Sequence, residues 1–192
     1  MDIRLINIVK QFDNKLVLNH CNITFKENKI HCLMGPSGVG KTTLINILMG
    51  LIKPDSGEIQ GMEKRIVAAV FQEDRLIEHW DAIRNVKLVC KKAITDDMII
   101  HEFKAVGLED YRGKPVSKLS GGMRRRVAIV RGLMAESDVI IMDEPFKGLD
   151  KALKKQILEY VKNRARNKTV IIVTHDQEEV DVLGGELHYL SS

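Results

Sequence analysis

Residues 35–43 read Gly35-Pro36-Ser37-Gly38-Val39-Gly40-Lys41-Thr42-Thr43 and fit the phosphate-binding pattern G-x-x-x-x-G-K-[ST]. The apolar run 29–34 before them predicts a buried strand, and the run 44–49 after them predicts a helix. This strand–loop–helix order is the context that the pattern requires. The glycines let the backbone approach an anion, and the helix presents its positive end to the same place. We therefore expect Lys41 to reach the β- and γ-phosphates of a nucleotide and Thr42 to supply a hydroxyl for Mg²⁺.

The composition predicts one globular domain. The chain has 192 residues, 44% of them hydrophobic, and a formal net charge of +4. It contains no apolar run of 18 residues and no signal-peptide pattern at its start, so a cytoplasmic protein is the default expectation. Cys21 and Cys32 each follow a histidine, but their spacing is wider than that of zinc clusters, and we interpret both as small apolar residues.

The pattern of apolar residues predicts an α/β fold. Residues 1–30 alternate between apolar and polar and predict short antiparallel strands. Continuous apolar runs at 66–71, 138–142 and 169–174 predict buried strands, which alternate with helical segments and so indicate a parallel sheet covered on both faces. The helical segments are expected at 121–135 and 151–166.

Residues 76–110 differ from their surroundings, because apolar residues recur there at helical spacing. Thr95 is expected to cap a helix that ends near Gly107. We expect a single domain over 1–192, with a helical subdomain inserted at about 76–135. Five basic residues cluster near the end of this region, and they favour a solvated helix face over a nucleic-acid surface, since no aromatic residues lie among them: Lys118, Arg124, Arg125, Arg126 and Arg131.

Two acidic residues follow a buried strand. Asp143 and Glu144 come directly after the apolar residues 139–142, at the strand end where open α/β sheets bind ligands. Asp143 is a candidate Mg²⁺ ligand, and Glu144 is a candidate base that orients and deprotonates an attacking water. Taken alone, the pair is better explained as an ordinary strand end with two solvated acids.

A second candidate anion site lies at 119–122, where Leu119-Ser120-Gly121-Gly122 opens a helix. A serine hydroxyl, glycine N–H groups and a helix N-terminus can together bind a phosphate. Gln72 and His175 each follow an apolar strand, and an amide or an imidazole there can contact Mg²⁺, water or a γ-phosphate. Each of these residues alone would pass as a surface residue.

Together, and in this order, the motifs resemble the ATPase subunits of ABC transporters over about residues 3–190. The resemblance matches the Walker A loop at 35–43, the Q-loop at Gln72, the signature at 119–123, the Walker B strand at 139–143 with catalytic Glu144, and the H-loop at His175. It implies a P-loop NTPase with a mostly parallel core sheet, an N-terminal antiparallel β-subdomain and a helical insertion. Phe12 falls where the family places an aromatic residue on adenine, although a core phenylalanine explains it equally well.

The resemblance also implies a mechanism and partners. ATP and Mg²⁺ are the cofactors, and two chains would close around two ATP molecules, each held between one phosphate loop and the partner's Ser120, Gly121 and Gly122. Gln72 would join Thr42 and Asp143 at the metal. Separate transmembrane permease subunits and a solute-binding protein are expected, at the cytoplasmic face of the membrane, with no nucleic acid. The permease would dock after Gln72, near Leu76, Ile77 and Trp80, unless these three pack into the helical core.

The segments 70–76 and 144–146 look most like bacterial importer ATPases, and the nitrate, sulfonate and taurine group is the expected type. Two motifs depart from the family pattern: the signature has Met123 where glutamine is commonest, and the D-loop at 148–150 has Gly148 where serine or alanine is usual. The segment between Lys41 and Gln72 is short, which predicts a trimmed β-subdomain. The alternatives are a soluble ABC-type ATPase acting on ribosomes or DNA, a P-loop kinase, and a degenerate nucleotide-binding regulator.

Overall fold

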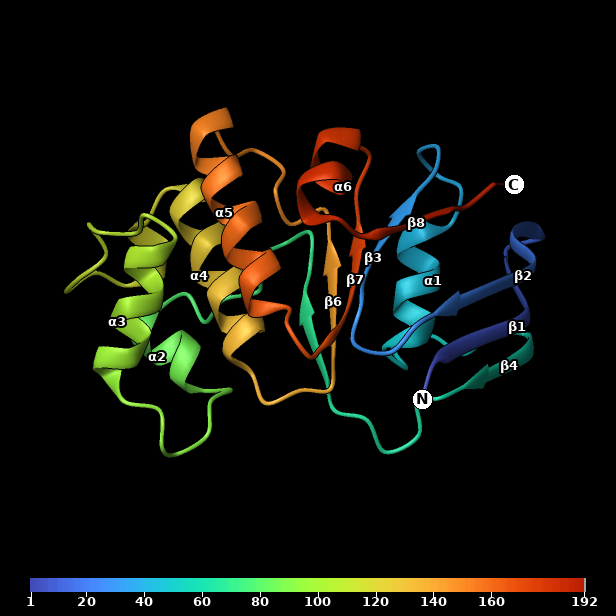
Figure 1. The fold of residues 1–192 in the computed structure, drawn as a ribbon, viewed down its shortest axis with the longest axis horizontal. Helices are drawn as coiled ribbons and strands as arrows, with labels where there is room; N and C mark the ends of the chain where they lie inside the picture. The colour runs from blue at the N-terminus through green and yellow to red at the C-terminus, as the bar shows by residue number, and fades with distance from the viewer. Residues whose placement is uncertain (192) are drawn as a thin grey trace.

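The computed structural model describes residues 1–191, and Figure 1 shows them as a central sheet with helices on one side and a helix and a smaller sheet on the other. The elements follow one another as β1 (Ile3–Phe12), β2 (Lys15–Phe25), β3 (Ile30–Met34), α1 (Lys41–Leu48), β4 (Ser56–Gln60), β5 (Val67–Val70), α2 (Ala82–Lys87), α3 (Asp96–Ala105), the 3₁₀ turn Val116–Lys118, α4 (Gly121–Met134), β6 (Val139–Asp143), α5 (Lys151–Arg164), β7 (Thr169–Val173), α6 (Gln177–Leu183) and β8 (Glu186–Tyr189).

The central sheet has five parallel strands in the order β5-β6-β7-β3-β8. Its inner strands are apolar on both faces because both faces are covered. Ile140 and Met142 of β6 pack into one hydrophobic core, with residues of α4, α5 and α6, while Val139 and Ile141 pack into the other, with residues of α1 and the antiparallel sheet. The predicted α/β fold with a parallel sheet is confirmed.

The N-terminal strands form a three-stranded antiparallel sheet in the order β2-β1-β4. Strands β1 and β2 are 10 and 11 residues long, so the expectation of short strands is wrong in length. Three register shifts let the pair stay hydrogen-bonded along this length while it curves. Asp13 and Asn14 join the two strands, and both have the positive φ of a tight hairpin turn (45° and 65°).

The helix boundaries follow from capping side chains. The Thr95 side chain accepts a hydrogen bond from the backbone N–H of Met98 at the start of α3, as predicted, and Gly107 follows the end of that helix with a φ of 64°. Helices α2 and α3 pack on α4, away from the parallel sheet (Figure 1). Within residues 1–191, no helix has the length and hydropathy needed to cross a bilayer.

Candidate functional site

The phosphate loop connects the end of β3 to α1, which begins at Lys41. Gly40 is the N-cap residue of α1 and has a φ of 105°, in the left-handed region that favours glycine. A Cβ at Gly40 would lie 2.9 Å from Cδ2 of Leu18 and 3.0 Å from Cγ1 of Val17, so β2 closes one side of the loop. The loop is therefore held by both sheets.

Lys41 folds back over this loop. Its Nζ donates hydrogen bonds to the carbonyl oxygens of Gly35 and Pro36, each at 2.8 Å. An ammonium group has three donors, and these two carbonyls hold it at the mouth of the loop. A phosphate bound there would meet the charge of Lys41 together with the backbone N–H groups at the start of α1.

Thr42 and Asp143 meet although they are 101 positions apart in the sequence. The Thr42 hydroxyl donates to Oδ2 of Asp143 at 3.1 Å, and this links the phosphate loop to the end of β6. Burial raises the pKa of Asp143, the hydrogen bond from Thr42 opposes this, and the neighbouring Glu144 charge raises it further. A buried carboxylate beside a hydroxyl is a set of hard oxygen donors that suits Mg²⁺ and would be stabilised by its charge.

Glu144 lies directly beyond β6 with a φ of 44°, which is uncommon for a residue with a side chain. Its Oε1 lies 3.6 Å from Nδ1 of His175, and its Oε2 lies 3.0 Å from Nζ of Lys147. Burial alone would raise the pKa of Glu144, but the hydrogen bond and charge of Lys147, with smaller contributions from His175 and Lys41, lower it below its usual range. Glu144 is thus ionised at neutral pH.

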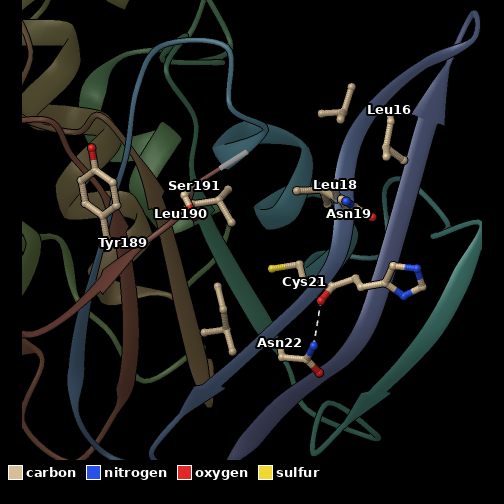
Figure 2. Close-up of a pocket in the computed structure, with 11 residues that line it drawn as sticks. Leu16, Leu18, Asn19, Cys21, Asn22, Tyr189, Leu190 and Ser191 are labelled. Atoms are coloured by element: carbon tan, nitrogen blue, oxygen red, sulfur yellow. Dashed lines mark hydrogen bonds between the residues drawn. The ribbon is translucent and has the colours of Figure 1, made fainter.

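These groups surround one open cavity of about 590 Å³ at the carboxyl ends of the parallel strands. The structure brings Gln72 and His175 into it beside the phosphate loop and the two acids. Its lining consists of Val17, Gly35, Ser37, Gly38, Gly40, Lys41, Thr42, Thr43, Gln72, Asp143, Glu144, Lys147, Val173 and His175. A separate hollow lies between β2 and the segment Tyr189–Ser191 at the end of β8 (Figure 2). A Cβ at Gly35 would lie 2.3 Å from the Leu190 carbonyl oxygen.

Ser120, Gly121 and Gly122 do not line this cavity. Ser120 is the exposed N-cap residue of α4, and its Oγ accepts a hydrogen bond from the N–H of Met123 at 3.3 Å. A Cβ at Gly121 would meet nothing within 4 Å, so the start of α4 is open to solvent. The predicted second anion site is therefore separate from the phosphate loop within one chain.

The prediction of a solvated helix face is wrong for three of the clustered arginines. Arg125 is buried, with 7% of its surface exposed, and donates to the carbonyl oxygens of Phe71, at 2.7 Å, and Gln72. Arg131 donates to the carbonyls of Asp74 and Arg75, and Arg126 donates to that of Gly107. Helix α4 thus holds the segment that carries Gln72, because guanidinium groups satisfy carbonyls that have no strand partner.

Phe12 is not a core residue: it is 42% exposed at the end of β1 and does not line the cavity. The Lys10 ammonium lies 5.2 Å from its ring centroid. Of the three residues expected at a docking surface, Leu76 is buried in the core of the helical region, while Ile77 and Trp80 are half-buried. Core packing therefore explains Leu76.

Sequence reasoning missed three residues that line the cavity, Val17, Lys147 and Val173, and the contact that Arg125 makes beside it. Lys147 follows Glu144 by three residues in a tight turn, and this spacing is a sequence signal from which their ion pair could have been predicted. Val17 reaches the cavity from β2, and nothing in its local sequence indicates this. Arg125 was seen only as part of a basic cluster, and its contact with the Gln72 segment depends on the tertiary fold.

Residues 18–147 match the sequence profile of a family described as ABC transporter. The chain is 38% identical to the "Spermidine/putrescine import ATP-binding protein PotA" of Spiroplasma citri, over 96% of this chain and 57% of that protein. It is 36% identical to the protein of the same name from Mycoplasma capricolum subsp. capricolum, over 92% of this chain and 55% of that protein. The chain spans about half the length of these curated relatives.

Solved structures show the same fold. The bacterial ABC transporter cassette MJ0796, described as dimeric, superimposes with a TM-score of 0.86 at 29% identity, over 98% of this chain and 94% of that one. A post-hydrolysis state of the same cassette, bound to ADP and Pi, gives a TM-score of 0.85 at 28% identity. With its phosphate loop, acidic strand end and helix-capping serine in the arrangement described above, the chain belongs to the ABC transporter family and is an ATP-binding cassette.

Proposed function

We propose that this chain binds ATP with Mg²⁺ and hydrolyses it to power transport by an ABC importer. The observation that carries the proposal is the hydrogen bond between Thr42 and Asp143, because it brings the phosphate loop and the acidic strand end to one point. A bound Mg²⁺ would offset the negative charge of the phosphates there. Thr42 and Asp143 would hold it, with Gln72 at the edge of the same cavity.

The chain's own residues bind the phosphates, accept the proton of the attacking water and orient the base. Lys41 and the N–H groups of the loop bind the phosphates, so the γ-phosphate lies at the cavity side that Glu144 and His175 face. Glu144 accepts the proton of the attacking water, and its lowered pKa keeps it ionised for this task. His175, whose Nδ1 lies 3.6 Å from Glu144, orients that carboxylate and hydrogen-bonds the γ-phosphate.

Dimer closure follows from the separation of the two anion sites. Ser120, Gly121 and Gly122 lie outside the cavity of their own chain, so they serve a nucleotide bound to a second copy. The γ-phosphate then joins the two chains, and hydrolysis lets them part. The similar cassette MJ0796, which is described as dimeric, supports this arrangement.

Transport of a solute requires partner proteins besides this chain. We infer that separate permease subunits form the membrane pathway, that a solute-binding protein delivers the solute, and that the cassette acts at the cytoplasmic face. The relatives above are named for import of spermidine and putrescine, and none of them for nitrate, sulfonate or taurine, so polyamine import is the better candidate. Reconstitution with the neighbouring permease genes and uptake of labelled polyamines tests this directly; uptake of an unrelated solute alone would reject it.

Replacing Lys41 by alanine tests the nucleotide site itself. Charge-assisted hydrogen bonds contribute about 1.5–3 kcal/mol each, so Lys41→Ala is expected to weaken MgATP binding roughly 10- to 150-fold and to abolish hydrolysis. Titration calorimetry measures the affinity. Lys53→Ala, a change at an exposed lysine outside the cavity, is the matched control and leaves binding unchanged. Equal ATP affinity in the two variants would refute the phosphate-loop assignment.

A further inference from the structure

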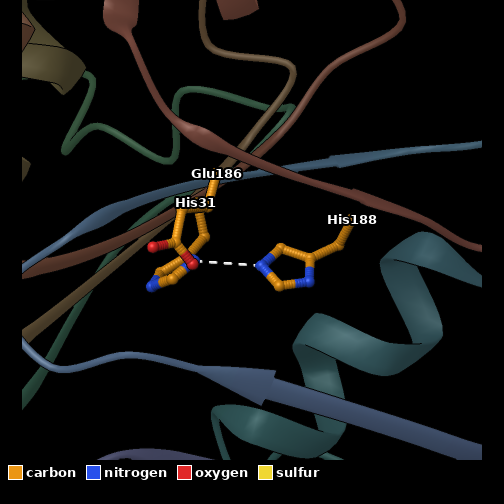
Figure 3. Close-up of side chains that lie close together, drawn as sticks. All are labelled: His31, Glu186 and His188. Carbon is orange, nitrogen blue, oxygen red and sulfur yellow. Dashed lines mark hydrogen bonds and ion pairs between the residues drawn. The ribbon is translucent and has the colours of Figure 1, made fainter.

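A group of three side chains with metal-ligating atoms lies outside the nucleotide cavity. His31 of β3 and Glu186 and His188 of β8 each offer one ligand atom, and these atoms all lie within 4.8 Å of one another (Figure 3). Nδ1 of His31 lies 3.0 Å from Nε2 of His188 and 3.9 Å from Oε2 of Glu186. None of the three lines the nucleotide cavity, and the proposed function uses none of them.

The fold builds this group from strand geometry. Strand β8 is the edge strand beside β3, and in their parallel register His31 pairs with Glu186 while Leu33 pairs with His188. Side chains two residues apart lie on one face of a strand, so Glu186 and His188 both point to the face that carries His31. Phe25 packs edge-on against both imidazoles, with centroid distances of 5.3 Å and 5.0 Å, and limits their rotation.

The hydrogen bonds around His31 determine which of its ring nitrogens is free to bind a metal. Its Nε2 lies 2.9 Å from the carbonyl oxygen of Lys26, which can only accept, so Nε2 carries a proton and the neutral ring presents its Nδ1 lone pair to His188 and Glu186. Histidines that bind metals almost always donate their other N–H in this way. Glu186 is also held, because Nζ of Lys26 donates to its Oε1 at 3.0 Å.

We propose that His31, Glu186 and His188 form a site for a divalent first-row transition metal, best suited to Zn²⁺, that fastens edge strand β8 to β3. Two imidazoles and a carboxylate match three-ligand zinc sites, which keep a fourth position for water. Tetrahedral ligands at roughly 2.0–2.2 Å from zinc lie about 3.3–3.6 Å from one another. The separations of 3.0 Å and 3.9 Å from Nδ1 of His31 lie on either side of this range.

The burial pattern supports this assignment. His31 is fully buried, whereas Glu186 and His188 are half-buried at the sheet edge, so an ion can enter and a water can complete its coordination. Cys32 is buried in the core on the opposite face of β3, so its thiol is not part of the set. The plain alternative is a hydrogen-bonded histidine pair without a metal.

Metal binding is measured on the full chain after treatment with a chelator, with ZnCl₂ as the probe and no nucleotide. The expected result is one Zn²⁺ per chain by calorimetry, together with a higher melting temperature in zinc. His188→Gln and Glu186→Gln each weaken binding by at least ~10-fold, since loss of even an outer partner of a metal ligand costs that much. His101→Gln, at an exposed histidine of α3, keeps wild-type binding.

Substitution with Co²⁺ identifies the ligands by absorption. The proposed site gives visible bands of a low-coordinate cobalt ion without the thiolate-to-cobalt band that a cysteine ligand adds. The proposal would be overturned if the chain bound no stoichiometric zinc, or if the cobalt spectrum showed a thiolate band. It would also be overturned if His188→Gln and Glu186→Gln bound zinc as tightly as the wild-type chain. His31 is left unchanged because its replacement in the core would disturb folding. The readout needs no ATP, so its outcome is independent of the proposed function.

Discussion

Replacing Glu144 by glutamine is expected to lower ATP turnover by at least ~10²-fold while ATP still binds. Glutamine has nearly the same size and keeps the acceptor oxygen, so the cavity retains its shape. It has no carboxylate to take the proton of the attacking water. The phosphate loop and Lys41 remain, and the loss therefore falls on kcat and leaves nucleotide affinity close to that of the native chain.

The control for this variant is Glu159→Gln, the same chemical change at an exposed position of α5. Steady-state phosphate release and ATP titration are measured on both proteins. Turnover of Glu144→Gln within a few-fold of the control would remove Glu144 from the role of base. The pairing of Glu144 with Lys147 adds a check, because Lys147→Ala removes the main interaction that lowers the pKa of Glu144 and so shifts the acidic limb of the rate profile to higher pH.

The sequence predicted the parts of the site that are contiguous in the chain. The phosphate loop is encoded within nine residues, and the strand before it and the helix after it follow from apolar runs. The positions of Asp143 and Glu144 at a strand end followed from the same reasoning, and so did the capping role of Thr95. These features depend on local hydrogen bonding and periodicity, which neighbouring residues determine.

What could not be predicted depends on tertiary contacts. Arg125 belongs to a run of three arginines, and only the packing of α4 decides which of them is buried against the Gln72 segment. The pairing of His31 with Glu186 requires the parallel register of β3 and β8, whose residues are 155 positions apart. Helix α6 and strand β8 were not predicted, because both are short and β8 alternates exposed and half-buried residues.

The start of α4 offers the sharpest test of the dimer mechanism. In a Glu144→Gln background the γ-phosphate persists, so MgATP is expected to hold two chains together. Adding Ser120→Arg places a bulky side chain where the partner's γ-phosphate belongs, and the dimer is expected to be lost. Binding of one ATP per chain remains, because Ser120 does not line the cavity of its own chain.

Ser120 also caps α4, so its replacement is expected to cost about 0.5–2 kcal/mol of stability. Ser117→Arg is the control for the added positive charge, since it places the same side chain at an exposed residue of the preceding 3₁₀ turn and keeps the Ser120 cap. Light scattering with and without MgATP, after a melting curve has shown that each variant is folded, gives the comparison. A folded Ser120→Arg variant that still dimerises would show that the signature does not bridge chains, because an arginine cannot share the space of a γ-phosphate, and the proposed transport cycle would then lose its mechanical step.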